Sequence, residues 1–235
     1  MNRRTAPMIA AGVLLTVSCG SILGVRGDGN FTSEPRQVAD FIGVDLAGVG
    51  RVEIEIGDPA SLTIEAEDNL LPLLTSDVSD GVLVLGTTEN VNPTGDIVYS
   101  VTMPDVETLE VSGSGQIEVA GVSSDTVDLA VSGSGSVSLD DVTFERIGVD
   151  VGGSGSVTVS GTTTDLEVSI SGSGSLDAED LTADSARVEI SGSGSVVVDV
   201  RENLSVDVSG SGSVEYLGSP TVESDISGSG SVAPR

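Results

Sequence analysis

The chain has 235 residues and a formal net charge of −28, with 37 Asp and Glu, nine Arg, no Lys and no His. This balance excludes a nucleic-acid partner, because phosphate binding needs a basic patch, and it disfavours docking of the body onto anionic lipid head groups. Apolar residues make up 38% of the chain and aromatic residues 2%. Such a core, rich in Val, Leu, Ile and Ala, is typical of packed β-strands.

The first 18 residues predict a signal peptide. Arg3 and Arg4 precede a mainly apolar stretch at 6–17, which is too short to cross a hydrocarbon layer of about 30 Å. The stretch ends in a segment at 15–20 that resembles a bacterial lipobox, with Cys19 as the residue that would carry the lipid. We therefore predict export, lipidation of Cys19 and attachment to a membrane through that anchor, outside the cytoplasmic membrane or at the cell surface. An ordinary signal peptide with an incidental cysteine is the alternative.

Residues 19–37 are polar, carry Gly and Ser and show no period, so they predict a lipid-anchored tether. The folded domain is predicted to occupy 38–235. Apolar and polar residues alternate over 44–56, as in a strand with one buried face. Residues 68–74 form the one short helical candidate, because Asp and Asn at its start could cap a turn. Further strands are predicted at 81–86 and 97–103.

A repeated tetrapeptide dominates the second half of the chain. Ser-Gly-Ser-Gly begins at 112, 132, 171, 191, 209 and 227, and Gly-Gly-Ser-Gly begins at 152, giving steps of 20, 20, 19, 20, 18 and 18 residues. Residues 47–54 align with 112–119 as a degenerate earlier copy. A fixed period that carries alternating apolar residues predicts an all-β, parallel solenoid with coils of about 18–20 residues.

The parity of the repeat assigns its residues to faces. In the copy at 109–119, Leu109, Val111, Gly113, Gly115 and the apolar residues after them share one parity, so both glycines are predicted to face inward at a tight bend. The serines are then predicted to point outward as a ladder of hydroxyls. Outward serine at a bend is most often bonded to the local backbone; the alternative is a contact surface. The candidate contact residues are Ser112, Ser114, Ser132, Ser134, Ser154, Ser171, Ser173, Ser191, Ser193, Ser209, Ser211, Ser227 and Ser229.

No catalytic site, metal site or cofactor is predicted. Without His there is no Ser-His-Asp triad and no histidine zinc site, and without Lys there is no phosphate loop of the Walker A type. A calcium β-roll needs Asp where these repeats carry Ile117, Val137, Val157 and their equivalents. The acidic pairs Asp140-Asp141 and Glu179-Asp180 fall at predicted loops, where a solvated acidic face is favoured over loose cation binding.

The chain also resembles a known family, the head GIN domain family of putative autotransporter adhesins. The resemblance is carried by 36–38, 41–44, 67–72 and 101–104, then by the Ser-Gly-Ser-Gly series and the closing segments at 216–220 and 226–232. It covers roughly 36–233. It implies a right-handed β-helix-like solenoid on an exported, often lipid-anchored bacterial protein, and it supplies no catalytic residues.

These observations lead to one functional hypothesis and two alternatives. The first is a non-enzymatic cell-envelope lipoprotein whose head domain presents a repetitive surface for adhesion. Its expected partners, besides the membrane, are an envelope polysaccharide, a surface protein or a second copy. The second is a structural or self-associating envelope spacer without a specific ligand. The third is a polysaccharide-processing β-helix, for which no pair of carboxylates is singled out.

Overall fold

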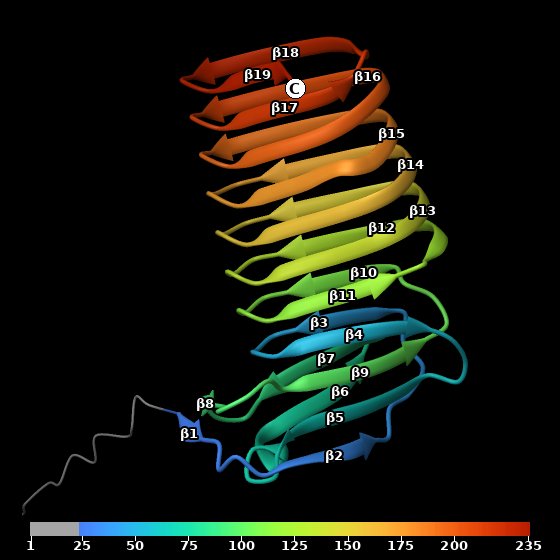
Figure 1. Cartoon of the computed structure of the whole chain (residues 1–235), viewed down its shortest axis with the longest axis vertical. Helices are drawn as coiled ribbons and strands as arrows, with labels where there is room; N and C mark the ends of the chain where they lie inside the picture. Colours follow the sequence, from blue (N-terminus) through green and yellow to red (C-terminus); the bar gives the residue numbers. More distant parts are fainter. Residues whose placement is uncertain (1–23) are drawn as a thin grey trace, which may run out of the picture.

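Strands form wherever apolar and polar residues alternate, and they make up nearly all regular structure of the computed structural model, which describes residues 24–235. The predicted all-β solenoid is confirmed (Figure 1). The helical candidate at 68–74 is reduced to one 3-10 turn, η1 (Leu71–Leu73), with Pro72 in its first turn. Within the described residues, no helix is long and apolar enough to cross a membrane. The predicted signal peptide and Cys19 lie outside the described residues.

The strands divide into an irregular N-terminal part and a regular stack (Figure 1). The N-terminal strands are β1 (Val25–Arg26), β2 (Phe31–Arg36), β3 (Gly43–Leu46), β4 (Arg51–Ile56), β5 (Ser61–Glu67), β6 (Leu74–Ser79), β7 (Val82–Thr87), β8 (Val91–Asn92) and β9 (Val98–Met103). The stack comprises β10 (Thr108–Val111), β11 (Gln116–Ala120), β12 (Ser123–Val131), β13 (Ser136–Val151), β14 (Ser156–Ile170), β15 (Ser175–Gly192), β16 (Ser195–Gly210), β17 (Ser213–Gly218), β18 (Thr221–Gly228) and β19 (Ser231–Pro234).

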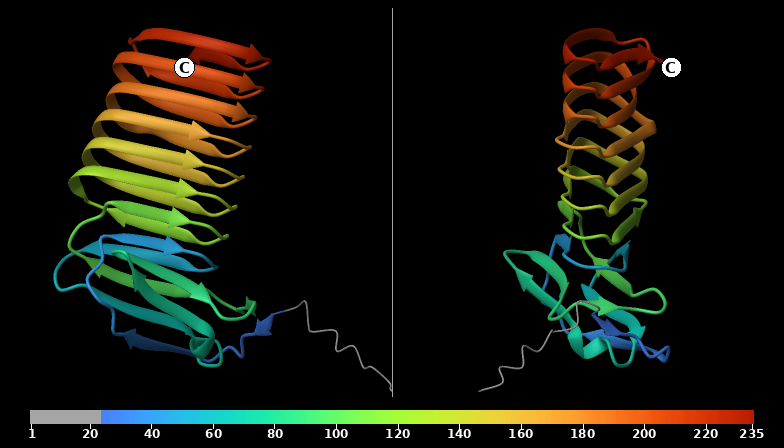
Figure 2. Two further views of the ribbon diagram at one scale, coloured as in Figure 1. Left: turned by 180° about the vertical axis from the view of Figure 1, so that it is seen from behind. Right: turned by 90° about the vertical axis from the view of Figure 1, so that its left-hand side faces the viewer.

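Each coil of the stack runs from one tight bend, along a strand, around a wide arc and back along a second strand to the next bend (Figures 1 and 2). Neighbouring coils pair in parallel and in register. Leu109 lies beside Leu129, Leu129 beside Val149, and Val149 beside Val168. Parallel stacking of like residues places each apolar column in one continuous core, as the period predicts.

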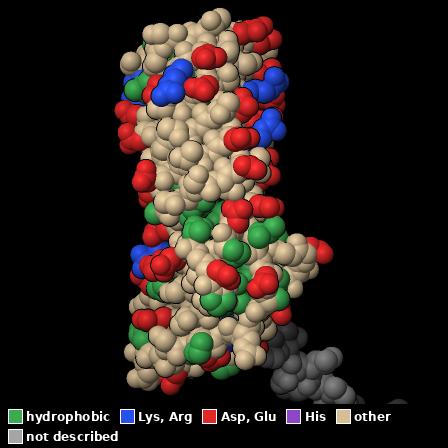
Figure 3. Space-filling model, turned by 90° about the vertical axis from the view of Figure 1, so that its right-hand side faces the viewer, with side chains coloured by type: hydrophobic (Ala, Val, Ile, Leu, Met, Phe, Trp, Pro, Cys, Tyr) green, Lys and Arg blue, Asp and Glu red, His purple; other side chains and the backbone are tan. Residues whose placement is uncertain are grey.

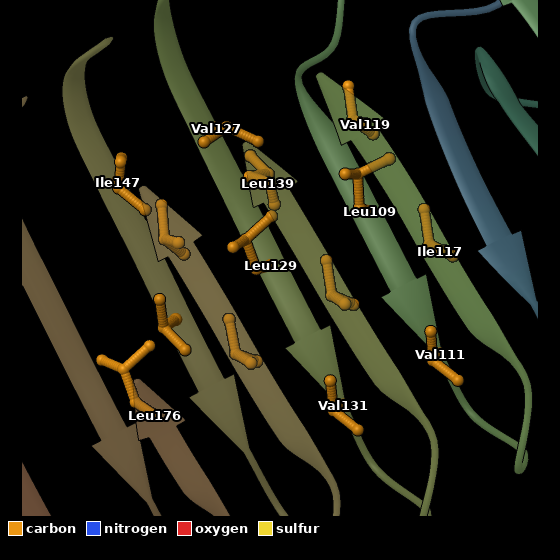
Figure 4. Close-up of a cluster of buried hydrophobic side chains, with 14 of the residues drawn as sticks. Leu109, Val111, Ile117, Val119, Val127, Leu129, Val131, Leu139, Ile147 and Leu176 are labelled. Carbon is orange, nitrogen blue, oxygen red and sulfur yellow. The ribbon is translucent and has the colours of Figure 1, made fainter. Parts of the chain in front are cut away.

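The core is a set of such columns between the two walls of the coil. Figure 4 shows Leu109, Val111, Ile117 and Val119 of one coil directed toward the same interior as Leu129 and Leu139 of the next. All six side chains are at most 3% exposed. The apolar residue after each bend, where a calcium β-roll would need Asp, is buried from Ile117 through to Val214, and in the last coil Val232 is partly buried.

The early degenerate copy is a genuine coil. β3 pairs with β10 and β4 with β11, so that Val44 lies beside Leu109 and Val52 beside Ile117. This is the register predicted from the alignment of 47–54 with 112–119. On their other side β3 and β4 pair with β7 and β9, which follow later in the chain. The order of coils in the stack therefore differs from their order in the sequence.

Antiparallel strands cover the N-terminal end of the stack. β6 pairs with β7, β5 with β9, and β2 with β5, all antiparallel. The predicted tether boundary at 37 is therefore corrected, because β1 and β2 fall inside 19–37 and β2 is hydrogen-bonded to the domain. The sequence pattern did not predict β2, because five of its six residues are exposed and the strand therefore shows no alternation of apolar and polar residues.

A buried carboxylate fastens this N-terminal segment. The Glu67 side chain, at the end of β5, is 0% exposed. Its carboxylate accepts hydrogen bonds from the Gly29 N–H (3.0 Å) and from the N–H and hydroxyl of Thr94. The Thr94 hydroxyl is the main reason that the pKa of Glu67 lies below its ordinary value, with the two backbone N–H groups acting in the same direction against burial. Glu67 thus ties the segment after β1 to the loop after β8.

The C-terminal end of the stack has no comparable cover within the described chain. β18 pairs with β16 alone and β19 with β17 alone. Val222 is 36% exposed and Ile226 40%, although the residues beside them in the coil below, Leu204 and Val208, are fully buried. At this end of the solenoid, the apolar columns of the core therefore finish in partly exposed side chains.

Candidate contact surface

The tetrapeptide repeats form the tight bends on one side of the solenoid. We call this set the bend column; it comprises residues 112–115, 132–135, 152–155, 171–174, 191–194, 209–212 and 227–230. The right-hand view of Figure 2 looks onto this side, and the bends lie above one another from the green coils to the red. One short sequence, repeated at a fixed period, thus builds one edge of the molecule.

The parallel hydrogen-bond ladder continues through the bends. The Ser132 N–H donates to the Val111 carbonyl (3.0 Å), that of Ser134 to Gly113 (3.1 Å) and that of Ser136 to Gly115 (3.0 Å). The same pattern recurs in later bends, for example from Ser154 to Gly133 and from Ser173 to Gly153, both at 3.0 Å. The bend column is therefore held to the spacing of the strands, about 4.8 Å from coil to coil.

The second glycine of each bend faces the core, as predicted. Gly115, Gly135, Gly155, Gly174, Gly194 and Gly212 are all buried. A Cβ on Gly194 would lie 2.6 Å from Cγ2 of Ile170, and one on Gly212 would lie 2.6 Å from Cγ2 of Ile190. An apolar side chain of the preceding coil fills the space that a side chain here would need.

The first glycine does not face the core, and this part of the prediction is wrong. Gly113 and Gly133 are partly exposed, and a Cβ on Gly133 would collide with the Gly113 carbonyl oxygen in the coil below. The same clash recurs along the column, as for Gly153 over Gly133. The chain bends here, so strict alternation of inward and outward residues fails. Glycine is required because the backbone of the preceding coil is close.

All thirteen candidate serines are exposed, as predicted, in an aligned ladder along the bend column. Within the described chain, one of their hydroxyls has a hydrogen-bond partner: Ser112 Oγ lies 3.3 Å from Oδ1 of Asp45. The expectation that these hydroxyls bond the local backbone is therefore wrong. The backbone N–H groups of serines such as Ser132, Ser134 and Ser154 are used in the ladder between coils, whereas the serine side chains are exposed to solvent.

Two carboxyl groups lie at the N-terminal end of this ladder. Asp45 and Glu110 occupy the same register position on β3 and β10. Burial raises the pKa of Asp45, although the Ser112 hydroxyl partly offsets this, and burial together with the nearby Asp45 charge raises the pKa of Glu110. Like charges directly opposite each other on paired strands are destabilising, so the pair of Asp45 and Glu110 is unfavourable when both groups are ionised.

The bend column also borders two hollows, which share Ser114. One, of about 480 Å³, lies between the first bends and the β8 region and is lined by Gly48, Gly113, Thr87 and Asn90 among others. The other, of about 230 Å³, is lined by Arg51, Asp96 and Gln116. Sequence reasoning missed both, because Ser114 and residues 87–96 are brought together only by the N-terminal strands.

A third hollow lies away from the bend column. It has a volume of about 350 Å³, and its lining includes Arg146, Arg187, Asn203 and Glu223 from successive coils. Arg146 lies 3.6 Å from Glu167, and Arg187 lies 2.7 Å from Glu189, so both guanidinium groups have acidic neighbours. Figure 3 shows the side opposite the bends, where acidic side chains line both borders.

The acidic residues do not assemble a metal site in the part of the chain that the structure describes. No group of three or more His, Cys, Asp or Glu side chains is placed to hold an ion there. The pairs Asp140-Asp141 and Glu179-Asp180 lie within β13 and β15 rather than in loops, contrary to prediction. The first pair falls at a register shift, with Asp141 at a positive φ of 55°.

A family model now identifies the group to which the solenoid and its bend column belong. The model described as putative auto-transporter adhesin, head GIN domain, matches residues 40–220. The chain belongs to this family. The predicted resemblance is thereby confirmed for this head GIN protein. None of the curated proteins matches it in sequence.

Solved structures support the same fold. A putative adhesin from Bacteroides fragilis superposes with a TM-score of 0.84 at 23% identity, covering 90% of this head GIN protein and 100% of the other chain. A putative adhesin from Parabacteroides distasonis gives 0.70 at 26% identity, with 90% and 100% covered. A protein from the same organism described as a putative lipid binding protein gives 0.70 at 21% identity, with 90% and 99% covered.

Proposed function

We propose that this head GIN protein is a non-enzymatic adhesin of the bacterial cell envelope, exported and anchored by a lipid on Cys19. Its bend column is the contact surface, and its partner is an envelope polysaccharide or a surface protein. Membership of an adhesin family supports a location at the surface or outside the cell. The sequence before the domain supports export, since a charged start and an apolar stretch precede Cys19.

One observation carries the assignment of the contact surface. The thirteen serines form an aligned, exposed ladder whose hydroxyls, apart from that of Ser112, have no partner within the described residues. Small side chains on a rigid backbone lose little conformational entropy when a partner is bound, because few rotamers must be ordered. Regular spacing further suits a partner that is itself a repeating polymer.

Substitution across adjacent coils tests this surface. Cells that display the full chain are allowed to adhere to wells coated with envelope polysaccharide, or with surface proteins, from the same bacterium. Changing Ser173, Ser193 and Ser211 to Lys should lower adhesion at least tenfold. A matched control changes Thr143, Thr162 and Ser205 to Lys, because these residues are exposed but lie outside the bends. Equal adhesion by the two variants would remove the bend column from the proposal.

The anchor has a separate test. Metabolic labelling with a fatty-acid analogue should label the full chain and should fail with Cys19→Ala. Equal labelling of the two proteins would refute the lipid anchor without touching the contact surface. If the polysaccharide and protein coatings both fail to retain cells, the spacer function becomes the better account of the solenoid.

A further inference from the structure

Within the described residues, the last coil presents a strand edge that pairs with no neighbour on its outer side. Parallel pairing directs the backbone of alternate residues to opposite neighbours. The Asp128 N–H donates to Glu107 in the coil below (2.9 Å), and the register of the stack places Glu223 of β18 at the position equivalent to Asp128. Further along the same chain segment, the Ser229 N–H donates to the Gly210 carbonyl (2.8 Å). The odd-numbered residues of β18 therefore face β16.

It follows that Val222, Ser224 and Ile226 direct their N–H and C=O groups away from β16, toward the open end. Their side chains continue the core columns above Leu204, Val206 and Val208. We call these three residues the tip edge. Val222 and Ile226 leave 36% and 40% of their surface exposed, while the core residues below them leave at most 3%. The tip edge thus combines unpaired backbone groups with unfinished apolar columns, which is the pattern that strand addition completes.

The opposite end of the molecule shows how such an edge is otherwise protected. The outermost N-terminal strand, β2, pairs on one side with β5 and carries Pro35, which has no N–H to donate. β18 has eight residues and no proline. β18 therefore has no proline that would hinder the addition of another strand, whereas β2 has Pro35.

The negative charge beside the tip edge favours a positively charged partner over a second copy of this chain. Glu223 and Asp225 alternate with the tip-edge residues and are exposed, and the whole chain carries a net charge of −28. A second copy pairing through the same strand would set these acids against their own equivalents, which is unfavourable. An extended segment that alternates apolar and basic residues would instead bury its apolar side chains over Val222 and Ile226 and place its cations beside Glu223 and Asp225.

We propose that the tip edge binds an extended basic-apolar segment of another protein by β-strand addition. This surface is separate from the bend column and goes beyond the adhesive contact proposed above. It lies at the end of the solenoid remote from the N-terminal strands (Figures 1 and 2).

The test uses the full chain and an end-blocked, fluorescently labelled peptide of sequence Lys-Val-Lys-Val-Lys-Val-Lys. The decisive variant is Ser224→Pro, which removes an N–H that faces the open end, keeps every bond to β16 and leaves the charge unchanged. Peptide affinity, measured by fluorescence anisotropy, should fall at least tenfold in this variant while its thermal unfolding stays that of the wild type. Hydrogen exchange should show the amides of Ser224 and Ile226 protected by the peptide.

Several outcomes would overturn the proposal. Equal affinity of wild type and Ser224→Pro would mean that the peptide is held by the overall negative charge alone. Equal binding of a Glu-Val peptide of the same length would refute the charge selection. A dimer of the peptide-free chain that sediments as a monomer after Ser224→Pro would make the second copy the occupant. The variant with Lys at 173, 193 and 211 should bind the peptide like the wild type, so failure of the bend column and failure of the tip edge are distinguishable.

Discussion

A single methyl group added at the second glycine of a bend should destabilise the solenoid strongly. In Gly155→Ala the new Cβ would lie 2.6 Å from the Gly135 carbonyl oxygen and 3.5 Å from Cβ of Val131, with a Val131 methyl closer still. That oxygen also accepts the ladder bond from the Ser156 N–H at 3.1 Å. Restoring an ordinary carbon–oxygen contact needs a shift of about 0.7 Å, which stretches this bond beyond hydrogen-bonding distance.

The cost has two parts. A lost backbone bond is worth roughly 0.5–1.5 kcal/mol, and overpacking beside buried Val131 costs about 1–3 kcal/mol. We expect the free energy of unfolding to fall by roughly 2–4 kcal/mol and the midpoint of thermal unfolding by roughly 4–15 °C. Far-UV circular dichroism on heating, with urea titration, measures both.

The same bend supplies the matched control. A Cβ on Gly152 would approach Ser132 Cα at 3.9 Å and Ser171 Oγ at 4.0 Å, which are ordinary contacts. Gly152→Ala should therefore be neutral or stabilise by about 0.4–1 kcal/mol, because it restricts the unfolded chain. If Gly155→Ala proved as stable as Gly152→Ala, the close approach of coils at the bend would be refuted as the reason for glycine.

Three further predictions concern the core and the buried charges. Leu176→Ala should lower the free energy of unfolding by about 2–5 kcal/mol, since the side chain is 1% exposed, whereas an unchanged urea midpoint would contradict its place in the core. Because the pKa of Glu67 is lowered in the folded protein, its carboxylate stabilises the fold at a pH above the ordinary glutamate pKa, and this contribution is lost as the pH falls through the pKa of the folded state. The difference in the free energy of unfolding between wild type and Glu67→Gln should therefore shrink on acidification. A difference that does not depend on pH would refute this. The raised pKa values of Asp45 and Glu110 have the opposite sign, so they cost stability at neutral pH and cease to do so on acidification. Glu110→Gln should therefore stabilise by about 0.2–1 kcal/mol at pH 7, which urea titration at pH 7 and pH 4 checks, and a destabilised variant at pH 7 would disprove the repulsion.

The stack was predictable because its information is local and repeated. The period alone predicts the length and number of the repeated coils, and the alignment of 47–54 with 112–119 predicts the pairing of Val52 with Ile117 that the structure shows. Parity works on straight strands because alternate residues face opposite sides. The parity rule failed at Gly113, because the chain bends there and residues two positions apart no longer face the same side.

The N-terminal strands were not predictable to the same degree. β2 is an exposed edge strand, so nothing in its sequence distinguishes it from a tether. The Glu67 carboxylate accepts hydrogen bonds from Gly29 and Thr94, which lie 38 and 27 positions away from it in the sequence, and no sequence pattern predicts such contacts. Among the contact residues, exposure of the thirteen serines followed from parity, whereas the hollows beside Ser114 required the three-dimensional arrangement.

The position of β3 and β4 in the stack has a consequence for how the molecule is made. Val44 pairs with Leu109, which follows it by 65 residues, whereas Leu109 pairs with Leu129, which follows by 20. During synthesis from the N-terminus, the coil of β3 and β4 is paired on both faces only after the whole N-terminal region and β10 have been made. Every later coil adds about 20 residues to an edge that already exists. We therefore expect closure of the N-terminal region to be the slow, entropically costly step of folding, after which each further coil adds to an edge that is already formed.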